Sequence, residues 1–276
     1  MHTGSDSLRL RQRIDPLLEL SAEVRTILRR WWRHPHLPWE TKADGSPVTA
    51  ADREVHATVA ATLARLWPDE PVVSEEDGGR FPRHKVPRYW LVDPLDGTRD
   101  FLAGGPDYVF CLALIADGEP VLGLIDWPAA DRTYWAVSGH GAAVWDGQAH
   151  RELTPAPRDP SSLVVAVSAH HGHRELAWLR RRRVRPTAVL ERGSALKFCL
   201  VADGTADLYL TVGGIHTWDV AAGHCLVAAS GGAVTDLKGR PLPYSNPLRP
   251  LSGVVAWSRG EAPLPWLTTP SGGRRP

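Results

Sequence analysis

Acidic residues follow two apolar segments of the chain. Residues 90–92 run directly into Asp93 and shortly afterwards into Asp96, and residues 72–74 run into Glu75. Each segment taken alone also fits a strand that ends in a surface turn or a solvated acidic loop. If the two strands are neighbours, their carboxylates converge, and like charges held close together require a cation. A hard divalent cation prefers oxygen ligands, so the pattern indicates a metal site.

A third element carries a further acidic residue, Asp219, at the start of an apolar segment, residues 218–229, which is expected to be a helix. Asp is also a common residue at helix N-termini, and capping alone would explain it. Together with Asp93, Asp96 and Glu75, however, it completes a set of oxygen donors without His or Cys. Such a set favours a hard ion over zinc.

Three segments, VVSEED, WLVDPLDGT and WDVAAGHCLVAASGG, occur in this order along the chain. They resemble the motifs of the Mg²⁺-dependent, lithium-sensitive phosphatase superfamily, which includes inositol monophosphatases, fructose-1,6-bisphosphatases and bisphosphate nucleotidases. The stretches SPVTAADREVH, GSALKFCLVADG and IHTWDVAAGH are most similar to those of bacterial 3'(2'),5'-bisphosphate nucleotidases. The resemblance implies removal of the 3'-phosphate of 3'-phosphoadenosine 5'-phosphate to leave AMP. Inositol or other sugar phosphates are the alternative substrates.

The resemblance also implies a ligand set for two or three Mg²⁺ ions. Glu75, Asp93 and the main-chain carbonyl of Leu95 would hold one ion, and Asp93, Asp96 and Asp219 would hold the second. Two cations about 3.5–4 Å apart can stabilise both the attacking water and the leaving oxygen of an in-line displacement. A non-catalytic phosphate-binding protein is the alternative of another class, and the intact ligand set argues against it.

Catalytic roles are implied for Asp52, Thr98 and Glu75, of which the first two would help to activate the water. Asp52 also fits a capping box with Thr49 at the start of a helix, and both roles can hold together. The amides of Gly97 and Thr98, at an expected helix start, would face the scissile phosphate. Lys42 precedes this segment and is either a site residue or a solvated loop residue.

Substrate contacts are implied for Gly193, Ser194 and Lys197, at an expected helix N-terminus that would bind the second phosphate or the ribose. A helix cap followed by an extended surface lysine is the alternative. The resemblance adds Asp219 to the substrate contacts, and it aligns His171 with a histidine near the substrate.

Two features depart from the nucleotidase pattern. An arginine commonly precedes the last motif by several residues, and Thr211 stands in its place here. Residues 214–219 are closer to those of inositol monophosphatases. These departures leave the metal chemistry intact and leave the identity of the leaving alcohol open.

The pattern of apolar residues predicts an α/β protein in which helices and strands alternate. Helices are expected at residues 8–32, 50–66, 174–182, 194–202 and 218–229. Strands are expected at residues 71–74, 89–92, 108–115, 121–125, 133–137, 163–168, 207–210 and 254–257. The resemblance implies a layered α/β/α/β/α sugar-phosphatase-like fold.

A cluster of prolines around residues 153–160 is the best candidate for a domain boundary. We predict an α+β part at residues 1–157, carrying most of the metal ligands, and an α/β part at residues 158–276, completing the site.

Composition narrows the class of protein further. The 276 residues carry 32 basic and 31 acidic side chains, so no global field attracts nucleic acid or an anionic membrane. The 3 cysteines are far apart in apolar segments, which fits reduced thiols and a cytoplasmic location. No apolar run is long enough to span a membrane. The expected partner is a small phosphate ester, and the resemblance also allows a homodimer.

Five arginines lie between Arg180 and Arg185. Such a run can contact nucleic acid, but no aromatic residues are interleaved with it and the protein is nearly neutral. A solvated helix face is the better interpretation.

Overall fold

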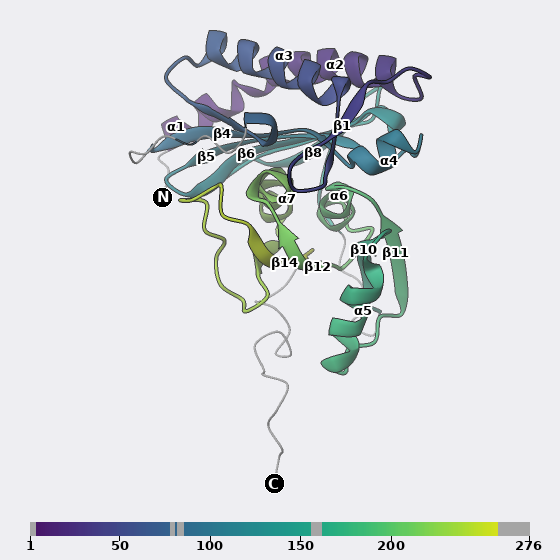
Figure 1. Ribbon diagram of the computed structural model, residues 1–276. Coiled ribbons are helices and arrows are strands. Elements are labelled where there is room, and N and C mark those ends of the chain that lie inside the picture. The colour runs from purple at the N-terminus through teal and green to yellow at the C-terminus, as the bar shows by residue number, and fades with distance from the viewer. Residues whose placement is uncertain (1–3, 78–80, 82–85, 156–161, 259–276) are drawn as a thin grey trace.

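Sheets and helices alternate in layers through the molecule. A computed structural model describes residues 4–77, 81, 86–155 and 162–258. Helices α2 and α3 cover a first sheet, helices α6 and α7 lie between this sheet and a second one, and α5 packs on the far side of the second sheet (Figure 1). The predicted α/β fold class, with its α/β/α/β/α layers, is confirmed.

The first sheet has seven strands in the order β3-β4-β5-β6-β7-β8-β9, so that sequential strands are neighbours throughout. Only β3 and β4 run parallel, and the other pairs are antiparallel. The strands are β3 (Val72–Ser74), β4 (Arg88–Asp96), β5 (Val109–Ala116), β6 (Glu119–Trp127), β7 (Arg132–Val137), β8 (Gly141–Trp145) and β9 (His150–Glu152).

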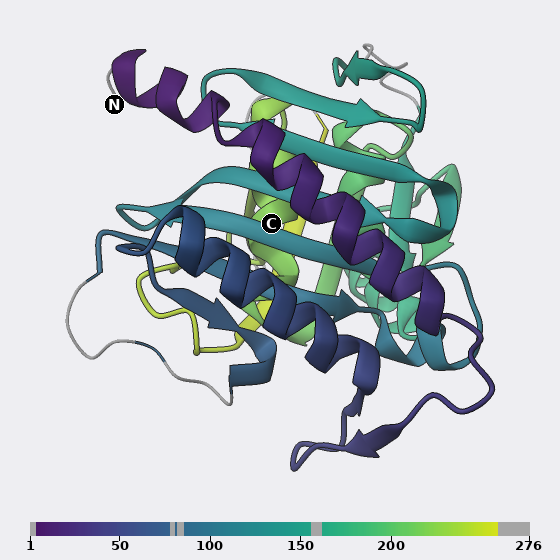
Figure 2. The same cartoon turned by 90° about the horizontal axis from the view of Figure 1, so that it is seen from above.

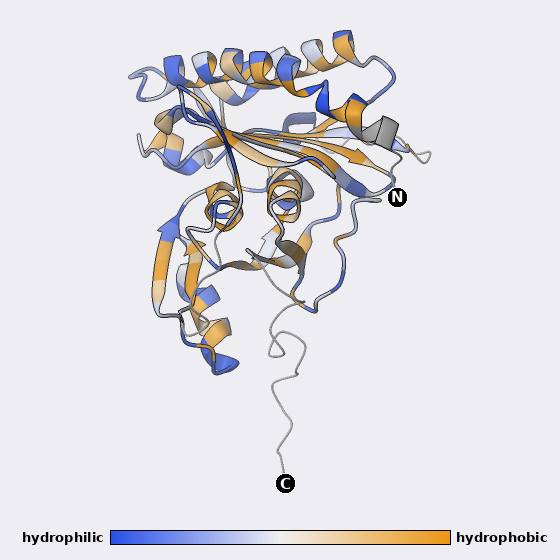
Figure 3. Cartoon of the chain, turned by 180° about the vertical axis from the view of Figure 1, so that it is seen from behind, coloured by the Kyte–Doolittle hydropathy of each residue, from blue (hydrophilic) through white to orange (hydrophobic). Residues whose placement is uncertain are grey.

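Two long helices cover one face of this sheet, as Figure 2 shows from above. They are α2 (Ile14–Trp31) and α3 (Ala50–Leu66), and the short α1 (Gly4–Arg11) precedes them. The hydropathy colouring shows apolar residues on the inner side of these helices (Figure 3). Helix α3 begins with the predicted capping box, because Thr49 accepts from the Asp52 amide and Asp52 accepts from the Thr49 amide.

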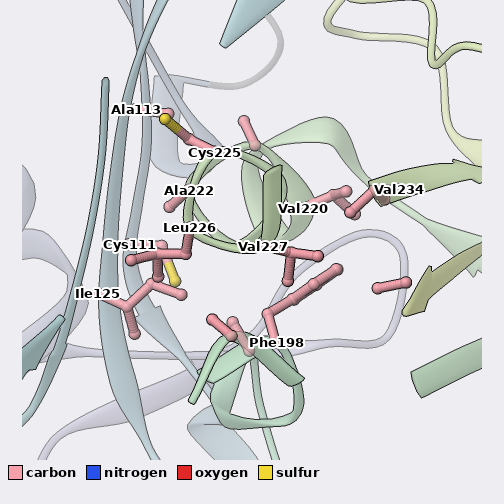
Figure 4. Close-up of a cluster of buried hydrophobic side chains, with 14 of the residues drawn as sticks. Cys111, Ala113, Ile125, Phe198, Val220, Ala222, Cys225, Leu226, Val227 and Val234 are labelled. Carbon is pink, nitrogen blue, oxygen red and sulfur yellow. The ribbon is translucent and has the colours of Figure 1, made fainter. Parts of the chain in front are cut away.

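The opposite face of the first sheet packs against α6 (Leu196–Ala202) and α7 (Thr217–Ala229). Figure 4 shows Cys111 and Ile125 of the sheet beside Ala222, Cys225 and Leu226 of α7. The helix approaches closely because the sheet has a glycine there, and a Cβ at Gly123 would lie 2.6 Å from the carbonyl oxygen of Ala222.

The second sheet has five strands in the order β11-β10-β12-β14-β13. Strands β11, β10 and β12 are parallel, and β14 is antiparallel to both of its neighbours. Helix α5 (Gly172–Arg181) packs on the face away from α6 and α7. The strands are β10 (Val164–Ser168), β11 (Ala188–Arg192), β12 (Leu208–Ile215), β13 (Ala233–Asp236) and β14 (Leu251–Trp257).

Short elements complete the fold. A two-stranded sheet pairs β1 (Trp39–Thr41) with β2 (Pro47–Thr49), and α4 (Thr98–Leu102) follows β4. Single 3₁₀ turns lie at η1 (Glu75–Asp77) and η2 (Pro128–Ala130).

Several predicted elements differ in extent from the observed ones. The helix expected at residues 8–32 is two helices separated by a turn, and Pro16 lies in the first turn of α2, where proline is tolerated. Strand β4 continues from residue 92 to Asp96, so its carboxylates belong to the strand and not to a turn after it. Helix α6 begins at Leu196 and not at residue 194. Strands β1, β2, β8, β9, β11 and β13 were not predicted, and of α4 only the start at Thr98 was expected.

The predicted division at residues 157 and 158 falls outside the described residues and stays a prediction. All three cysteines are buried free thiols. In the described part of the chain, no helix combines the length and the apolar character that crossing a membrane requires.

Candidate active site

The two acid-bearing strands are neighbours. Strand β3 runs parallel to β4 with Ser74 opposite Val92, so the residues that follow in each strand, Glu75 and Asp93, lie next to each other. Glu75 begins the 3₁₀ turn η1 at the carboxyl end of β3. The two segments were expected to be neighbouring strands, and the pairing of β3 with β4 confirms this.

An irregularity in β4 brings Asp93 and Asp96 to the same face of the sheet. Asp93 pairs with Cys111 and Asp96 with Val109, so β4 has one more residue than β5 between these pairs. This extra residue makes a β-bulge in β4 between Asp93 and Asp96. Pro94 lies in the bulge and has no amide hydrogen to donate to a neighbouring strand.

The burial of the neighbouring residues confirms that side chains after the bulge change faces relative to regular alternation. Leu91 packs in the cluster beneath α7, whereas Val92 and Leu95 pack in the cluster beneath α2 and α3. Regular alternation would place residues 92 and 95 on opposite faces. The bulge therefore turns both Asp93 and Asp96 towards α7.

Helix α7 brings a fourth acid, Asp219, to the same place. His216 is the N-cap of this helix, and its amide donates to Asp219 Oδ2 at 2.9 Å. The side chain of Asp219 also forms a hydrogen bond with Asp93. Asp219 is thus the N3 residue of a capping box and not the N-cap itself, and it also belongs to the acidic cluster. Its role as a metal ligand stays a prediction.

The acidic cluster of Asp93, Asp96, Asp219 and Glu75 is a concentration of like charge in a buried place. Burial, and then the charge of the other carboxylates, raises the pKa of Asp93 and Asp219 well above their usual range. Burial raises the pKa of Asp96 to about 6, although Lys197 and the Ala195 amide oppose the shift. A nearby cation would reverse these shifts.

The donor set of the acidic cluster fits a hard divalent cation, because every side-chain donor is an oxygen. As the side chains lie, no three His, Cys, Asp or Glu residues among the described ones enclose a metal position. One carboxylate is engaged elsewhere, since Lys42 Nζ donates to Glu75 Oε1 at 2.7 Å and to Glu76 Oε1 at 2.6 Å. The second oxygen of Glu75, Oε2, is not used in this ion pair.

Lys42 thus forms ion pairs beside the acidic cluster and is not a freely solvated loop residue, and its role in the site stays a prediction. It follows β1 in the β1–β2 hairpin, and its amide donates to Ser46 across the turn. Burial opposes its charge, but Glu75 and Glu76 raise the pKa of Lys42 above its usual value.

Asp52 and Thr98 lie beside the acidic cluster. Asp52 is 2 % exposed and accepts from the amide and the hydroxyl of Thr49, at 2.7 Å each. Burial raises the pKa of Asp52 to about 7, against the effect of these hydrogen bonds. The Thr98 hydroxyl donates to the Leu95 carbonyl oxygen at 3.0 Å, so it contacts the main-chain oxygen that was assigned to the metal.

Gly97 precedes α4 in a left-handed conformation with φ of 93°. A Cβ there would lie 2.6 Å from the Asp107 carbonyl oxygen, so both the backbone conformation and the space require glycine. The predicted helix start at Thr98 is confirmed.

A cavity of about 160 Å³ joins the acidic cluster to the second sheet. Of the predicted residues, Asp96, Asp219, Ser194 and Lys197 line it. Thr211, noted as a departure from the nucleotidase pattern, lines it as well. The sequence analysis did not identify the remaining lining residues, which are Ser168, Ala195, Phe198, Tyr209 and Ile215.

The loop before α6 is fastened to the first sheet. The Ala195 amide donates to Asp96 Oδ2 at 2.6 Å, and the Gly193 amide donates to Asp107 Oδ2 at 2.9 Å. Ser194 between them has a left-handed φ of 48°. Lys197 Nζ donates to the Ser194 carbonyl oxygen at 2.5 Å, which supports this unusual conformation from α6.

Lys197 is 5 % exposed, and burial lowers its pKa although Asp96 and Glu175 oppose the shift. It therefore lines the cavity as a buried cation among acids, and the alternative of an extended surface lysine is wrong.

His171 has a different position. It is the exposed N-cap of α5, its amide donates to Ser168 Oγ at 3.2 Å, and it is absent from the cavity lining. The neighbouring His170 lies 3.2 Å from Asp100 Oδ2 through Nε2. The role of His171 near the substrate stays a prediction.

A larger cavity of about 750 Å³ lies away from the acids, between α5 and β11. Arg180, Arg183 and Arg185 line it together with apolar residues. Arg182 instead stacks on Trp178, with its guanidinium carbon 3.5 Å from the ring centroid. The arginine run thus lies on α5 and the loop after it, and its solvation stays a prediction.

Solved structures show which class of protein has this fold. The CysQ protein of Bacteroides thetaiotaomicron, described as a bacterial member of the inositol monophosphatase family, is similar with a TM-score of 0.75 at 26% identity, covering 94% of this chain and 99% of that one. This layered arrangement is a phosphatase fold. A model of the inositol monophosphatase family matches residues 10–264, and the chain belongs to that family of phosphatases.

Curated relatives differ in their named substrates. The 3'(2'),5'-bisphosphate nucleotidase CysQ of Escherichia coli K12 is 41% identical over 207 residues, covering 74% of this chain and 82% of the relative. The histidinol-phosphatase of Mycobacterium tuberculosis H37Rv is 35% identical over 222 residues, covering 78% of this chain and 84% of the relative. Both relatives are phosphatases, but they are named for different phosphate esters. More than one alcohol leaving group therefore has to be considered.

Proposed function

We propose that this phosphatase is a Mg²⁺-dependent 3'(2'),5'-bisphosphate nucleotidase that converts 3'-phosphoadenosine 5'-phosphate to AMP and phosphate. The observation that carries the proposal is the cavity in which Asp96 and Asp219 share one space with Ser194 and Lys197. Acids for a metal and a cation for a second phosphate thus lie side by side. The identity of 41% to a CysQ nucleotidase supports the same substrate.

Magnesium would be held by the acidic cluster. Glu75, Asp93 and the Leu95 carbonyl are the proposed ligands of one ion, and Asp93, Asp96 and Asp219 those of a second. When bound, Mg²⁺ neutralises the charge of the phosphate and lowers the pKa of a water molecule. Burial of the ligands adds to this effect, because charges interact more strongly where water is excluded.

The other residues would orient the reacting groups. Asp52, with a pKa of about 7, can take up a proton near neutral pH, and the Thr98 hydroxyl lies against the Leu95 carbonyl beside it. The amides of Gly97 and Thr98 are proposed to donate to the phosphate that is removed. The left-handed turn at Gly97 lies directly ahead of α4.

The non-reacting part of the substrate would occupy the second-sheet side of the cavity. There Lys197 offers a buried ammonium and Ser194 a hydroxyl at the end of a rigid loop. Gly193, held by Asp107, fixes the start of this loop. Positioning of both ends of a substrate supplies much of the catalysis in phosphoryl transfer.

A second candidate is hydrolysis of inositol 1-phosphate or another small phosphate ester. Thr211 favours it, because this residue lines the cavity where nucleotidases commonly have an arginine. The similarity to a histidinol-phosphatase adds histidinol phosphate to the esters to be tested.

A phosphate-release assay separates these candidates. We would measure kcat/KM with Mg²⁺ for 3'-phosphoadenosine 5'-phosphate, inositol 1-phosphate, fructose 1,6-bisphosphate and histidinol phosphate. The Asp96→Asn variant, prepared in the same way, controls for contaminating phosphatases. We expect the bisphosphate nucleotide to give the highest value. A higher value for any other ester would reject the proposed substrate, and no release from any of them would reject the phosphatase chemistry.

A further inference from the structure

Glu175 is a buried carboxylate outside the acidic cluster, and the proposed reaction does not use it. It belongs to α5, on the far side of the second sheet, and is 1 % exposed. The helical spacing from Gly172 through Glu175 to Leu179 places it on the buried face of α5, where the neighbouring residues are apolar. A carboxylate buried among such residues is costly unless polar groups surround it.

The partners of Glu175 are groups of the cavity wall. Its Oε2 accepts from the Ser168 amide at 2.7 Å, at the last residue of β10. The Thr211 hydroxyl forms a hydrogen bond with the carboxylate, and the Lys197 ammonium attracts it. Ser168, Thr211 and Lys197 all line the cavity beside Asp96 and Asp219.

The route from α5 to these groups runs past the ends of two parallel strands. Val165 and Val167 of β10 face α5, whereas Ala166 packs towards α6 and α7. Ser168 has the same parity as Ala166, and it ends the strand. Glu175 therefore reaches around the carboxyl end of β10 from the α5 side, as the neighbouring positions of α5 and β10 in Figure 1 allow. Ligands of open α/β sheets bind at this end of the strands.

We propose that Glu175 is a positioning residue that sets the substrate preference of the cavity by holding Ser168, Thr211 and Lys197 in place. This inference rests on the proposed function in one respect, that the cavity receives the non-reacting part of the substrate. Glu175 does not touch the acidic cluster in this arrangement. Its influence therefore falls on the group that Lys197 binds and not on the phosphate that is removed.

The test is a double-mutant cycle of Glu175→Gln and Lys197→Ala. Glutamine keeps an oxygen that accepts from Ser168 and Thr211, but it removes the charge that attracts Lys197. For the bisphosphate nucleotide we expect KM to rise about tenfold in Glu175→Gln while kcat stays within about twofold. In the Lys197→Ala background the same substitution should raise KM by less than about twofold, because residues that act through one another are not additive.

Two controls separate positioning from a general loss of structure. Hydrolysis of 4-nitrophenyl phosphate, which has no second phosphate, should change by less than about twofold in Glu175→Gln. Glu191→Gln, at an exposed glutamate on β11, should leave both substrates unchanged. Thermal unfolding of each variant shows whether the fold is retained.

Additive effects of the two substitutions would overturn the proposal, as would an equal loss on both substrates or no change in KM. If the substrate panel selects another ester, the cycle is repeated with that ester. Coupling between the two residues would then support the role of Glu175 although the nucleotidase assignment had failed.

Discussion

The acidic cluster and the cavity wall behind it both hold buried charges, and they compensate these charges in different ways. The cavity wall consists of Ser168, Glu175, Lys197 and Thr211. The acidic cluster gathers charges of one sign, and apart from Lys42 at Glu75 it depends on a cation from solution. In the cavity wall a buried lysine is attracted by a buried glutamate and donates to main-chain carbonyls, so the charges are balanced within the chain. On the proposed function, the comparison assigns the chemistry to a bound ion and the selectivity to charged side chains of the protein itself.

Removal of metal is the strongest way to test this contrast. We expect a chelator to abolish hydrolysis of every ester and added Mg²⁺ to restore it, because the carboxylates alone repel a phosphate. Li⁺ should inhibit the Mg²⁺-restored activity. Phosphate release before and after chelation is the measurement, and activity that persists through exhaustive chelation would refute the metal assignment.

Asp96→Asn acts on the acidic cluster from the protein side. We expect kcat to fall on the order of a thousandfold at saturating Mg²⁺, as for the loss of one preorganised charge at a reaction centre. The fold should persist, because the asparagine oxygen can still accept from the Ala195 amide. The kcat is compared with the melting temperature of the same preparation. Equal turnover in the variant and the parent would exclude Asp96 from the metal site.

Lys197→Ala acts on the other region and should discriminate between substrates. We expect a ten- to hundredfold loss of kcat/KM for the bisphosphate nucleotide, equivalent to about 1–3 kcal/mol, from the lost charge on its second phosphate. Inositol 1-phosphate has no second phosphate and should be affected far less. Equal losses for both esters would show that the lysine only supports the Ser194 loop.

The acidic cluster could be predicted from the sequence more fully than the cavity wall. The acids of the cluster come from short segments in which an apolar run ends in a carboxylate, and such a signal is local. Pairing of β3 with β4 then brings Glu75 to Asp93. The bulge at Pro94 was not foreseen, although a proline between two strand acids could have indicated it.

The cavity wall was harder to predict because Ser168, Glu175, Lys197 and Thr211 come from four separate elements. Glu175 lies in an arginine-rich helix, where a glutamate would be expected to form surface ion pairs. Only its helical spacing from Leu179 indicated a buried face.

Strand β11 was missed because its apolar run is only three residues long, from Ala188 to Leu190, and charged residues follow it.

Thr211→Arg would restore the residue that nucleotidases commonly have here. We expect KM for the bisphosphate nucleotide to fall by about three- to tenfold, because an arginine can bind a phosphate in a bidentate manner. Glu175 should keep the hydrogen bond from the Ser168 amide but lose the one from the Thr211 hydroxyl. A KM that rises in this variant would show that the cavity has no room for a second cation beside Lys197.

The pH dependence of stability gives the smallest effect, and comparison with the Asp96→Asn variant isolates the contribution of the acidic cluster. The pKa of Asp96 is about 6 in the folded protein and 3.8 for the ordinary group. Between these values the folded state binds more protons than the unfolded state, so without metal the free energy of unfolding rises as the pH falls from 6 towards 4.

The pKa values of Asp93 and Asp219 shift in the same direction. Melting temperatures measured with a chelator should therefore rise over this range, and less so in Asp96→Asn. A parallel pH profile for the variant and the parent would contradict the shift assigned to Asp96.

The position of α7 between the two sheets has a consequence for motion. Asp219 is fixed to a helix that is buried on both sides, whereas Glu75 lies on a single 3₁₀ turn and is held by the hairpin lysine. Amide hydrogens of α7 should therefore exchange with deuterium only when the whole domain opens. Amide hydrogens around residues 40–46 and 74–77 should exchange faster and become protected when Mg²⁺ binds. The α7 side of the site would then stay rigid, and the side of Glu75 would become ordered on binding.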